Sequence, residues 1–325
     1  MLVLSDASAF AQDTIPDGAF DERYSLPAVS EANGKISFGY SYVDTGVSSL
    51  VNQFPTLPID PANAVFFTLD NSFEGAFVEA SVSIPLSQDF GFQIDGLYSE
   101  QTGNPTGFDF GVVGVGGHLF WRDPDKGLVG IYGHYVQADD VLDTYQIGTE
   151  VELYHQNVSI ELFAGWDTLA VELNPVNLAS GQGEEFLAGE AVVAFYPEPD
   201  FRISVGAAHN FEETRFTSGI EWQLSDSSLS PSFFANGDLS ENLTSLRAGL
   251  TFYFGAEPKS LIRRHREDDP QNRLQKNASA LQACANGILS TQLQVPLISP
   301  VTGMPNQLIL ENSVDGCTLT PLPTR

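Results

Sequence analysis

The charged side chains in the first 255 residues recur at alternate positions, a spacing that could gather them on one wall of a sheet. Carboxylates facing guanidinium groups would set up a field that binds or orients small polar solutes. The same groups could instead pair with one another and fill the space between them. The residues with this placement are Glu79, Asp95, Glu150, Glu152, Glu161, Asp167, Glu190 and Glu221, together with Arg202, Arg215 and Arg247.

The alternation is clearest from Ser245 to Phe254. Leu246, Ala248, Leu250, Phe252 and Phe254 would share one face, and Ser245, Arg247, Gly249, Thr251 and Tyr253 the other. Successive side chains of a strand point to opposite faces, so this pattern predicts a strand with one apolar wall and one polar wall. Aromatic residues occupy its last three positions, where a membrane interface would lie.

Eleven further alternating segments precede it, and the connections between them alternate between tight and longer. This rhythm is typical of an up-and-down antiparallel β-barrel with short turns at one end and loops at the other. We therefore predict an all-β transmembrane barrel of about 12 strands, in which 245–254 closes onto 36–42. The other predicted strands are 76–84, 90–98, 108–121, 128–136, 145–154, 158–166, 186–196, 201–208, 215–224 and 229–235.

The segment ending at Phe254 resembles the closing strand of bacterial outer-membrane β-barrels, and residues 33–254 resemble the general class of porin-like barrel proteins. The resemblance implies a place in the outer membrane of a Gram-negative cell, with both termini periplasmic. It also implies contact with outer-membrane lipid and lipopolysaccharide and insertion by the barrel-assembly machinery.

Composition agrees with this class. The net charge is −28, and its distribution is uneven, with −29 through Gly255 and +1 in the remainder. Phosphate contacts need Lys and Arg, so nucleic acid is not expected as a partner. No run approaches 18 apolar residues, which excludes a transmembrane helix. Ala9-Phe10-Ala11 reads as a small-x-small cleavage site, so residues 1–32 are interpreted as a signal-peptide remnant and periplasmic lead.

Residues 256–325 have a different character and are predicted to form a periplasmic tail after the barrel at 33–255. Asp269-Pro270 predicts the start of a helix that runs to about Ala283, with Leu274, Ala278 and Leu281 on one stripe. Cys284 and Cys317 are the only cysteines, and in an oxidising periplasm they predict one disulfide, worth about 3–4 kcal/mol.

An enzyme is not expected. Barrel hydrolases often place a nucleophilic Ser two positions after a His, and that motif is absent. The positions two residues after His118, His134, His155 and His209 are Phe120, Val136, Asn157 and Phe211. No cofactor or metal site is predicted either.

The sequence favours a narrow channel for small polar solutes or ions, with a cation preference from its acidic lumen. The alternative is a non-conducting structural or adhesion barrel that binds partners through its loops or tail. A third reading is a soluble secreted β-sandwich. These residues do not decide whether the lumen is open or sealed, and they do not specify a solute.

Overall fold

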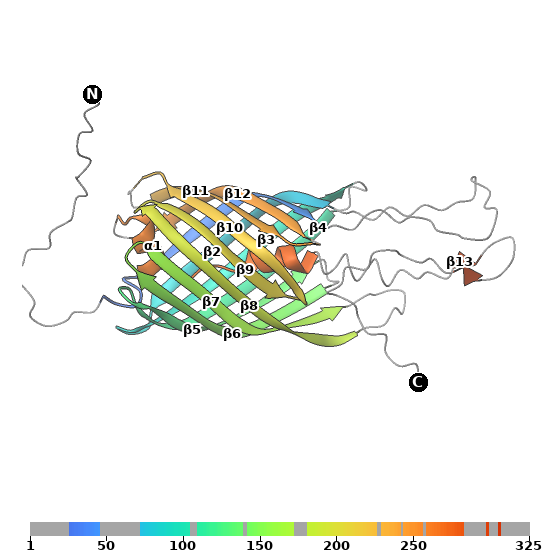
Figure 1. Ribbon diagram of the computed structural model, residues 1–325, viewed down its shortest axis with the longest axis horizontal. Helices are drawn as coiled ribbons and strands as arrows, with labels where there is room; N and C mark the ends of the chain where they lie inside the picture. The colour runs from blue at the N-terminus through green and yellow to red at the C-terminus, as the bar shows by residue number, and fades with distance from the viewer. Residues whose placement is uncertain are drawn as a thin grey trace, which may run out of the picture.

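The computed structural model describes residues 26–45, 72–104, 109–138, 142–171, 181–225, 229–241, 243–255, 258–282, 297–298 and 305–306. Twelve strands, each antiparallel to its neighbours in sequence, form a closed barrel (Figure 1). They are β1 Asn33–Asp44, β2 Ser72–Pro85, β3 Phe90–Asn104, β4 Asp109–Asp123, β5 Gly127–Ala138, β6 Leu142–His155, β7 Val158–Val171, β8 Gly181–Glu198, β9 Phe201–Asn210, β10 Glu213–Gln223, β11 Leu229–Leu239 and β12 Thr244–Phe254.

The predicted closure of the last strand onto the first is confirmed. β12 pairs with β1 in one uninterrupted register, from Gly34 opposite Phe254 to Asp44 opposite Thr244. On the outer face of this seam the rings of Phe38 and Phe252 stack with centroids 5.6 Å apart. A closed barrel leaves no strand edge without hydrogen bonds, which is a condition for crossing lipid. The reading as a β-sandwich is therefore wrong.

The outward face of the barrel is apolar, because alternate residues of each strand turn their side chains away from the lumen. Ile147, Val82 and Ile131 are 62 %, 56 % and 56 % exposed, and they belong to three different strands. Large exposed apolar surfaces mark contact with a partner or a membrane. The alternate residues, including the predicted charged positions, face inward. The outer wall thus has the composition that a hydrocarbon layer requires.

The two ends of the barrel differ, as the connection lengths predicted. Strands β2, β4, β6, β8 and β10 finish at one end, which we call the turn end, and β1, β3, β5, β7, β9 and β11 finish at the other, the loop end. At the turn end, Gly127 has a φ of +157°, and a Cβ there would lie 2.1 Å from the carbonyl oxygen of Glu152. This close approach explains the glycine that starts β5.

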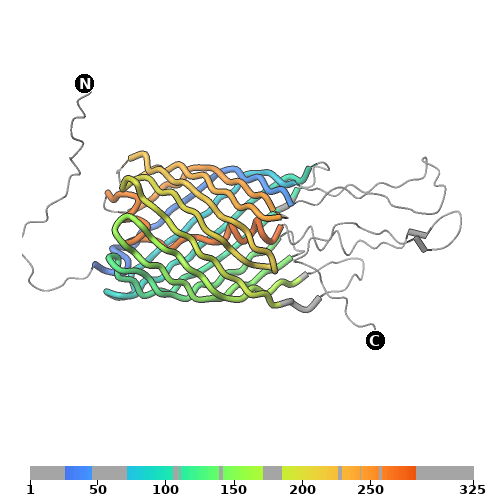
Figure 2. The backbone as a smooth tube through the Cα atoms, viewed as in Figure 1, coloured from blue at the N-terminus to red at the C-terminus, as the bar shows by residue number. Residues whose placement is uncertain are grey.

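The chain after β12 folds back into the barrel (Figure 2). Helix α1, Leu261–Glu267, lies at the turn end, and a second helical stretch covers 274–282. The alternating pattern ends at Phe254 and predicts only a tail beyond the barrel for this part, whereas residues 258–282 occupy the lumen. We call residues 258–282 the lumen segment. A two-stranded ribbon of β13 Leu297–Ile298 and β14 Pro305–Asn306 is separate from the barrel sheet.

The predicted start of the second helix at Asp269-Pro270 is wrong, because residues 270–273 are not helical. The helix instead begins at Leu274, whose backbone N–H donates to Oδ1 of Asn272 at 2.9 Å. The predicted apolar stripe of Leu274, Ala278 and Leu281 is buried as expected.

Several other sequence predictions fall outside the described residues. They include the cleavage site at residues 9–11 and the disulfide between Cys284 and Cys317. The division of the chain at residues 32 and 255 stays a prediction. Within the described part of the chain, neither helical stretch is long and apolar enough to cross a bilayer.

The outward face gives a first testable prediction. Replacing Ile131 with Arg would place a charge near mid-depth on the lipid side and lower the free energy of unfolding by about 2–4 kcal/mol. Urea unfolding of barrel refolded into lipid vesicles measures this, with Ile131→Leu as the matched control. Equal stability of the two variants would contradict a lipid-facing position for Ile131.

Candidate functional site

The lumen segment enters at the turn end, where α1 is fixed to the barrel turns. The backbone N–H of Ile262 donates to the carbonyl oxygen of Pro199 at 3.0 Å. The Arg266 guanidinium donates to the carbonyl oxygens of Gln156 (2.8 Å) and Val158 (2.9 Å). These contacts hold the entry of the lumen segment against two different turns.

Ion pairs continue just inside this entry. Lys259 lies 2.5 Å from the Asp268 carboxylate, and Lys35 on β1 lies 3.6 Å from Asp269. The Ser83 hydroxyl on β2 donates to Asp269 at 2.8 Å. Burial raises the pKa of Asp268 above its ordinary value, and the nearby Lys259 opposes this rise. The first part of the lumen segment is therefore held mainly by charge.

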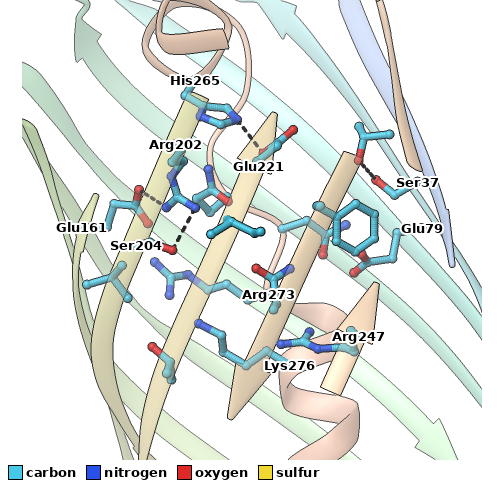
Figure 3. Close-up of a pocket in the computed structure, with 18 of the residues that line it drawn as sticks. Ser37, Glu79, Glu161, Arg202, Ser204, Glu221, Arg247, His265, Arg273 and Lys276 are labelled. Atoms are coloured by element: carbon cyan, nitrogen blue, oxygen red, sulfur yellow. Dashed lines mark hydrogen bonds and ion pairs between the residues drawn. The ribbon is translucent and has the colours of Figure 1, made fainter. Parts of the chain in front are cut away.

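At the centre, two cations of the lumen segment share one carboxylate of the wall. Arg273 pairs with Oε2 of Glu190 on β8, and Lys276 pairs with Oε1 of the same side chain. The Arg273 guanidinium also lies over the ring of Phe163, 5.1 Å from its centroid. Figure 3 shows both cations in the space between Arg202 and Arg247. We call Glu190 with its two partners, Arg273 and Lys276, the Glu190 clamp.

Toward the loop end, the contacts become apolar. Leu274, Ala278 and Leu281 pack in one buried cluster with wall residues. Polar contacts accompany this cluster: the Ser245 hydroxyl donates to Ser279 (3.3 Å), and the Gln282 side-chain amide donates to Gln101 (2.5 Å). The lumen segment thus runs from the turn end to the loop end. The wall residues of the cluster are Phe77, Leu97, Val112, Val136, Ala138, Leu142, Leu169, Phe186, Phe211 and Phe234.

The three predicted arginines lie on β9, β10 and β12, but each bonds to a nearby wall residue. Arg202 pairs with Glu161 at 2.8 Å, and Arg247 pairs with Asp238 on the neighbouring strand at 2.9 Å. Arg215 donates to the Asn210 side chain. These contacts bind the arginines to their own side of the lumen, so the arginines are not free to set up the predicted field against facing carboxylates.

On the other side of the lumen, His118 joins two of the predicted carboxylates. Its Nε2 lies 2.9 Å from Asp95, and its Nδ1 lies 2.9 Å from Glu150. The Tyr132 ring covers it, with centroids 4.4 Å apart. Two carboxylates on the two ring nitrogens match an imidazolium that donates twice. Both nitrogens are therefore engaged, and neither is directed at a serine hydroxyl. The expectation that the chain is not an enzyme stays a prediction.

The remaining predicted carboxylates also have polar partners. Glu152 accepts from Tyr154 at 2.6 Å, and Asp167 accepts from Gln146 at 2.7 Å. Glu79 accepts a longer bond, 3.3 Å, from the backbone N–H of Gln275 in the lumen segment. Glu221 accepts from Tyr253 (2.7 Å) and Ser232 (2.6 Å) and lies 3.3 Å from His265 in α1.

The lumen wall and the lumen segment are complementary in charge. The lumen segment carries six Lys and Arg against three Asp and Glu. In the described strands, acidic side chains outnumber basic ones on the lumen face, so the segment supplies the missing positive charge. The acidic side chains are Glu79, Asp95, Glu150, Glu152, Glu161, Asp167, Glu190, Glu221 and Asp238, and the basic ones are Lys35, Arg122, Arg202, Arg215 and Arg247.

A polar cavity of about 140 Å³ remains beside the lumen segment. Its lining brings together six of the predicted residues: Glu79, Glu161, Glu190, Glu221, Arg202 and Arg247. Asp95, Glu150, Glu152, Asp167 and Arg215 lie elsewhere on the wall. Asp238, His265, Arg273 and Lys276 also line the cavity, and they are not among the predicted site residues. Arg273 and Lys276 are three residues apart beside a predicted apolar stripe, a spacing that could have identified a shared carboxylate partner.

No family model and no curated protein matches the chain. Among solved structures, an outer membrane channel from Pseudomonas putida F1 is similar, with a TM-score of 0.50 and 8 % identity over 72 % of this chain and 100 % of that one. The translocator domain of the autotransporter NalP from Neisseria meningitidis has a TM-score of 0.48, with 9 % identity over 71 % of this chain and 90 % of that one. The KdgM porin with oligogalacturonate has a TM-score of 0.43, with 8 % identity over 68 % and 99 %.

At these identities the likeness shows the fold alone. The fold is that of outer-membrane β-barrels, so the resemblance read from the alternating strands is confirmed.

The path of the lumen segment can be tested by cross-linking. In a chain with Cys284→Ser and Cys317→Ser, the pair Ser245→Cys and Ser279→Cys is expected to form a disulfide, since the two serine hydroxyls are 3.3 Å apart. Non-reducing electrophoresis and mass spectrometry of the linked peptides detect the bond.

The control pairs Ser279→Cys with Ser230→Cys. Ser230 lies opposite Tyr253, eight residues along β12 from Ser245, or about 26 Å away. Cross-linking of both pairs, or of neither, would contradict the described path of the lumen segment.

Proposed function

We propose that this protein is an outer-membrane channel for small polar solutes and ions that its own lumen segment holds closed. The observation that carries the proposal is the Glu190 clamp beside a residual polar cavity. A lumen built only for rigidity would be served by apolar packing throughout, whereas this one keeps charged groups at its turn end and its centre. Movement of the lumen segment would join the cavity to both ends of the barrel.

The charge balance supports a cation preference in the open state. With the lumen segment in place, its net positive charge offsets the acidic wall. When the segment moves, carboxylates outnumber Lys and Arg on the exposed wall. Rings of acidic side chains favour cations in channels.

The energetics of the contacts support a closed state that can be opened. A buried ion pair contributes little net stability, because desolvation of the charges offsets their attraction. Removing one partner is costly, since it leaves an unpaired charge in the lumen. The Glu190 clamp therefore favours one position of the segment without making that position irreversible.

Conductance of the full-length chain in planar bilayers tests the proposal. We expect Arg273→Gln with Lys276→Gln to raise the open probability at least about tenfold, which corresponds to about 1.4 kcal/mol. Reversal potentials in a salt gradient should show cation preference. The cross-linked pair Ser245→Cys and Ser279→Cys should stay closed until it is reduced.

The matched control removes two charges at the turn end, Lys126→Gln with Arg263→Gln, and leaves the Glu190 clamp intact. Unboiled samples on detergent gels check that each barrel is folded. A folded double variant at the clamp that never conducts, at any voltage, would overturn the channel proposal.

A second candidate is an anchoring barrel that binds partners through its tail. The observation in its favour is that Gln282, the last described helical residue, bonds to Gln101 near the loop end of β3. For this candidate we expect a C-terminal epitope tag to bind antibody on intact cells. A tag inserted in the 123–127 turn should stay hidden. A C-terminal tag exposed only after permeabilisation would exclude this candidate.

A further inference from the structure

We propose that Glu190 and the cavity beside it form a binding site for small organic cations with guanidinium or ammonium groups. Arg273 and Lys276 occupy this site in the closed barrel and stand in for such a ligand. The inference rests on the proposed channel function, because it assigns the class of solute that competes with the lumen segment. A soluble organic dication would then both bind in the lumen and favour opening.

The groups that fill the site identify its chemistry. Each oxygen of the Glu190 carboxylate receives a different cation, one guanidinium and one ammonium. The Phe163 ring offers its face to the guanidinium at 5.1 Å, an arrangement that favours organic cations over compact metal ions. Arg273 and Lys276 are three residues apart in the chain and meet the same carboxylate, so one short molecule could present the same two groups.

The cavity supplies the space and the remaining charges. Its volume of about 140 Å³ has room for several waters or a small amine. Its lining holds Glu79, Glu161, Glu190, Glu221 and Asp238 against Lys35, Arg202, Arg247, Arg273 and Lys276. Without the two cations of the lumen segment, five carboxylates face three cations, which favours a positively charged solute and disfavours an anion.

Two of these carboxylates differ in how they are satisfied. Glu161 is engaged by Arg202 at 2.8 Å, whereas Glu79 accepts a 3.3 Å backbone bond from the lumen segment itself. Withdrawal of the lumen segment would remove Arg273 and Lys276 from Glu190. It would also remove the backbone N–H of Gln275 from Glu79. Glu190 would hold one end of a dication, and Glu79 would draw the other.

Isothermal titration calorimetry on the full-length barrel in detergent tests the site, with agmatine as the probe because it carries one guanidinium and one ammonium. We expect agmatine to bind the variant with Arg273→Gln and Lys276→Gln. The unsubstituted chain should bind at least about tenfold more weakly, because the lumen segment competes for the site. Adding Glu190→Gln to the double variant should abolish binding.

The matched control is Glu185→Gln on the same strand, an exposed position where binding should be unchanged. Glutarate, a dianion of similar length, should give no binding. Migration of unboiled samples on detergent gels confirms that each variant is folded.

The result separates this inference from the channel proposal. Agmatine binding that depends on Glu190 in a barrel that never conducts supports the site and overturns the channel. A conducting barrel in which agmatine binds no more tightly than glutarate overturns the site. Magnesium binding in place of agmatine, or agmatine binding that survives Glu190→Gln, also overturns it.

Discussion

A barrel in lipid must turn its apolar side chains outward, and in this chain that requirement concentrates charge in a narrow interior. The outer wall exposes apolar residues such as Ile131 and Ile147. Alternation then directs Glu150, Glu161 and the other alternate residues of each strand toward the lumen. Charges held away from bulk water need partners, since an isolated buried charge costs several kcal/mol. The interior therefore depends on how each of these charges is paired.

The chain meets this need in two ways. Some pairs lie within the wall, as between Arg247 and Asp238 or around His118. Others need the lumen segment, which brings a net positive charge to an acidic wall and fills the space that the wall leaves. The turn-end half of the segment is held by ion pairs, and the loop-end half is held by apolar packing around Leu274 and Leu281. Charge and shape thus fix the segment at different depths of the lumen.

The fold could be predicted from the sequence because its signals are local. Alternation within each strand and the lengths of the connections were sufficient for the strand number and for the pairing of β12 with β1. The partners in the lumen could not be predicted in this way. Arg202 alternates like any inward residue, but its bond to Glu161 crosses from β9 to β7. The pairing of Arg273 with Glu190 spans 83 residues and depends on a fold-back that no local pattern encodes.

The predicted field between facing carboxylates and guanidinium groups shows the same limit. Alternation correctly directed the acidic and basic side chains inward. It carried no information on whether Arg247 would reach across the lumen or bond to Asp238 beside it. Hydrogen-bond partners on adjacent strands depend on register, and that register follows from the closed pairing of all twelve strands.

The order of the elements along the chain has a consequence for synthesis. The lumen segment follows β12, so every strand of the wall is made before the residues that fill its interior. A chain that ended after β12 would contain every strand of the closed barrel and none of the residues 258–282 that occupy its lumen. Such a barrel would leave Glu190 without Arg273 and Lys276, so the pairing of charges in the interior depends on residues that are translated after the last strand.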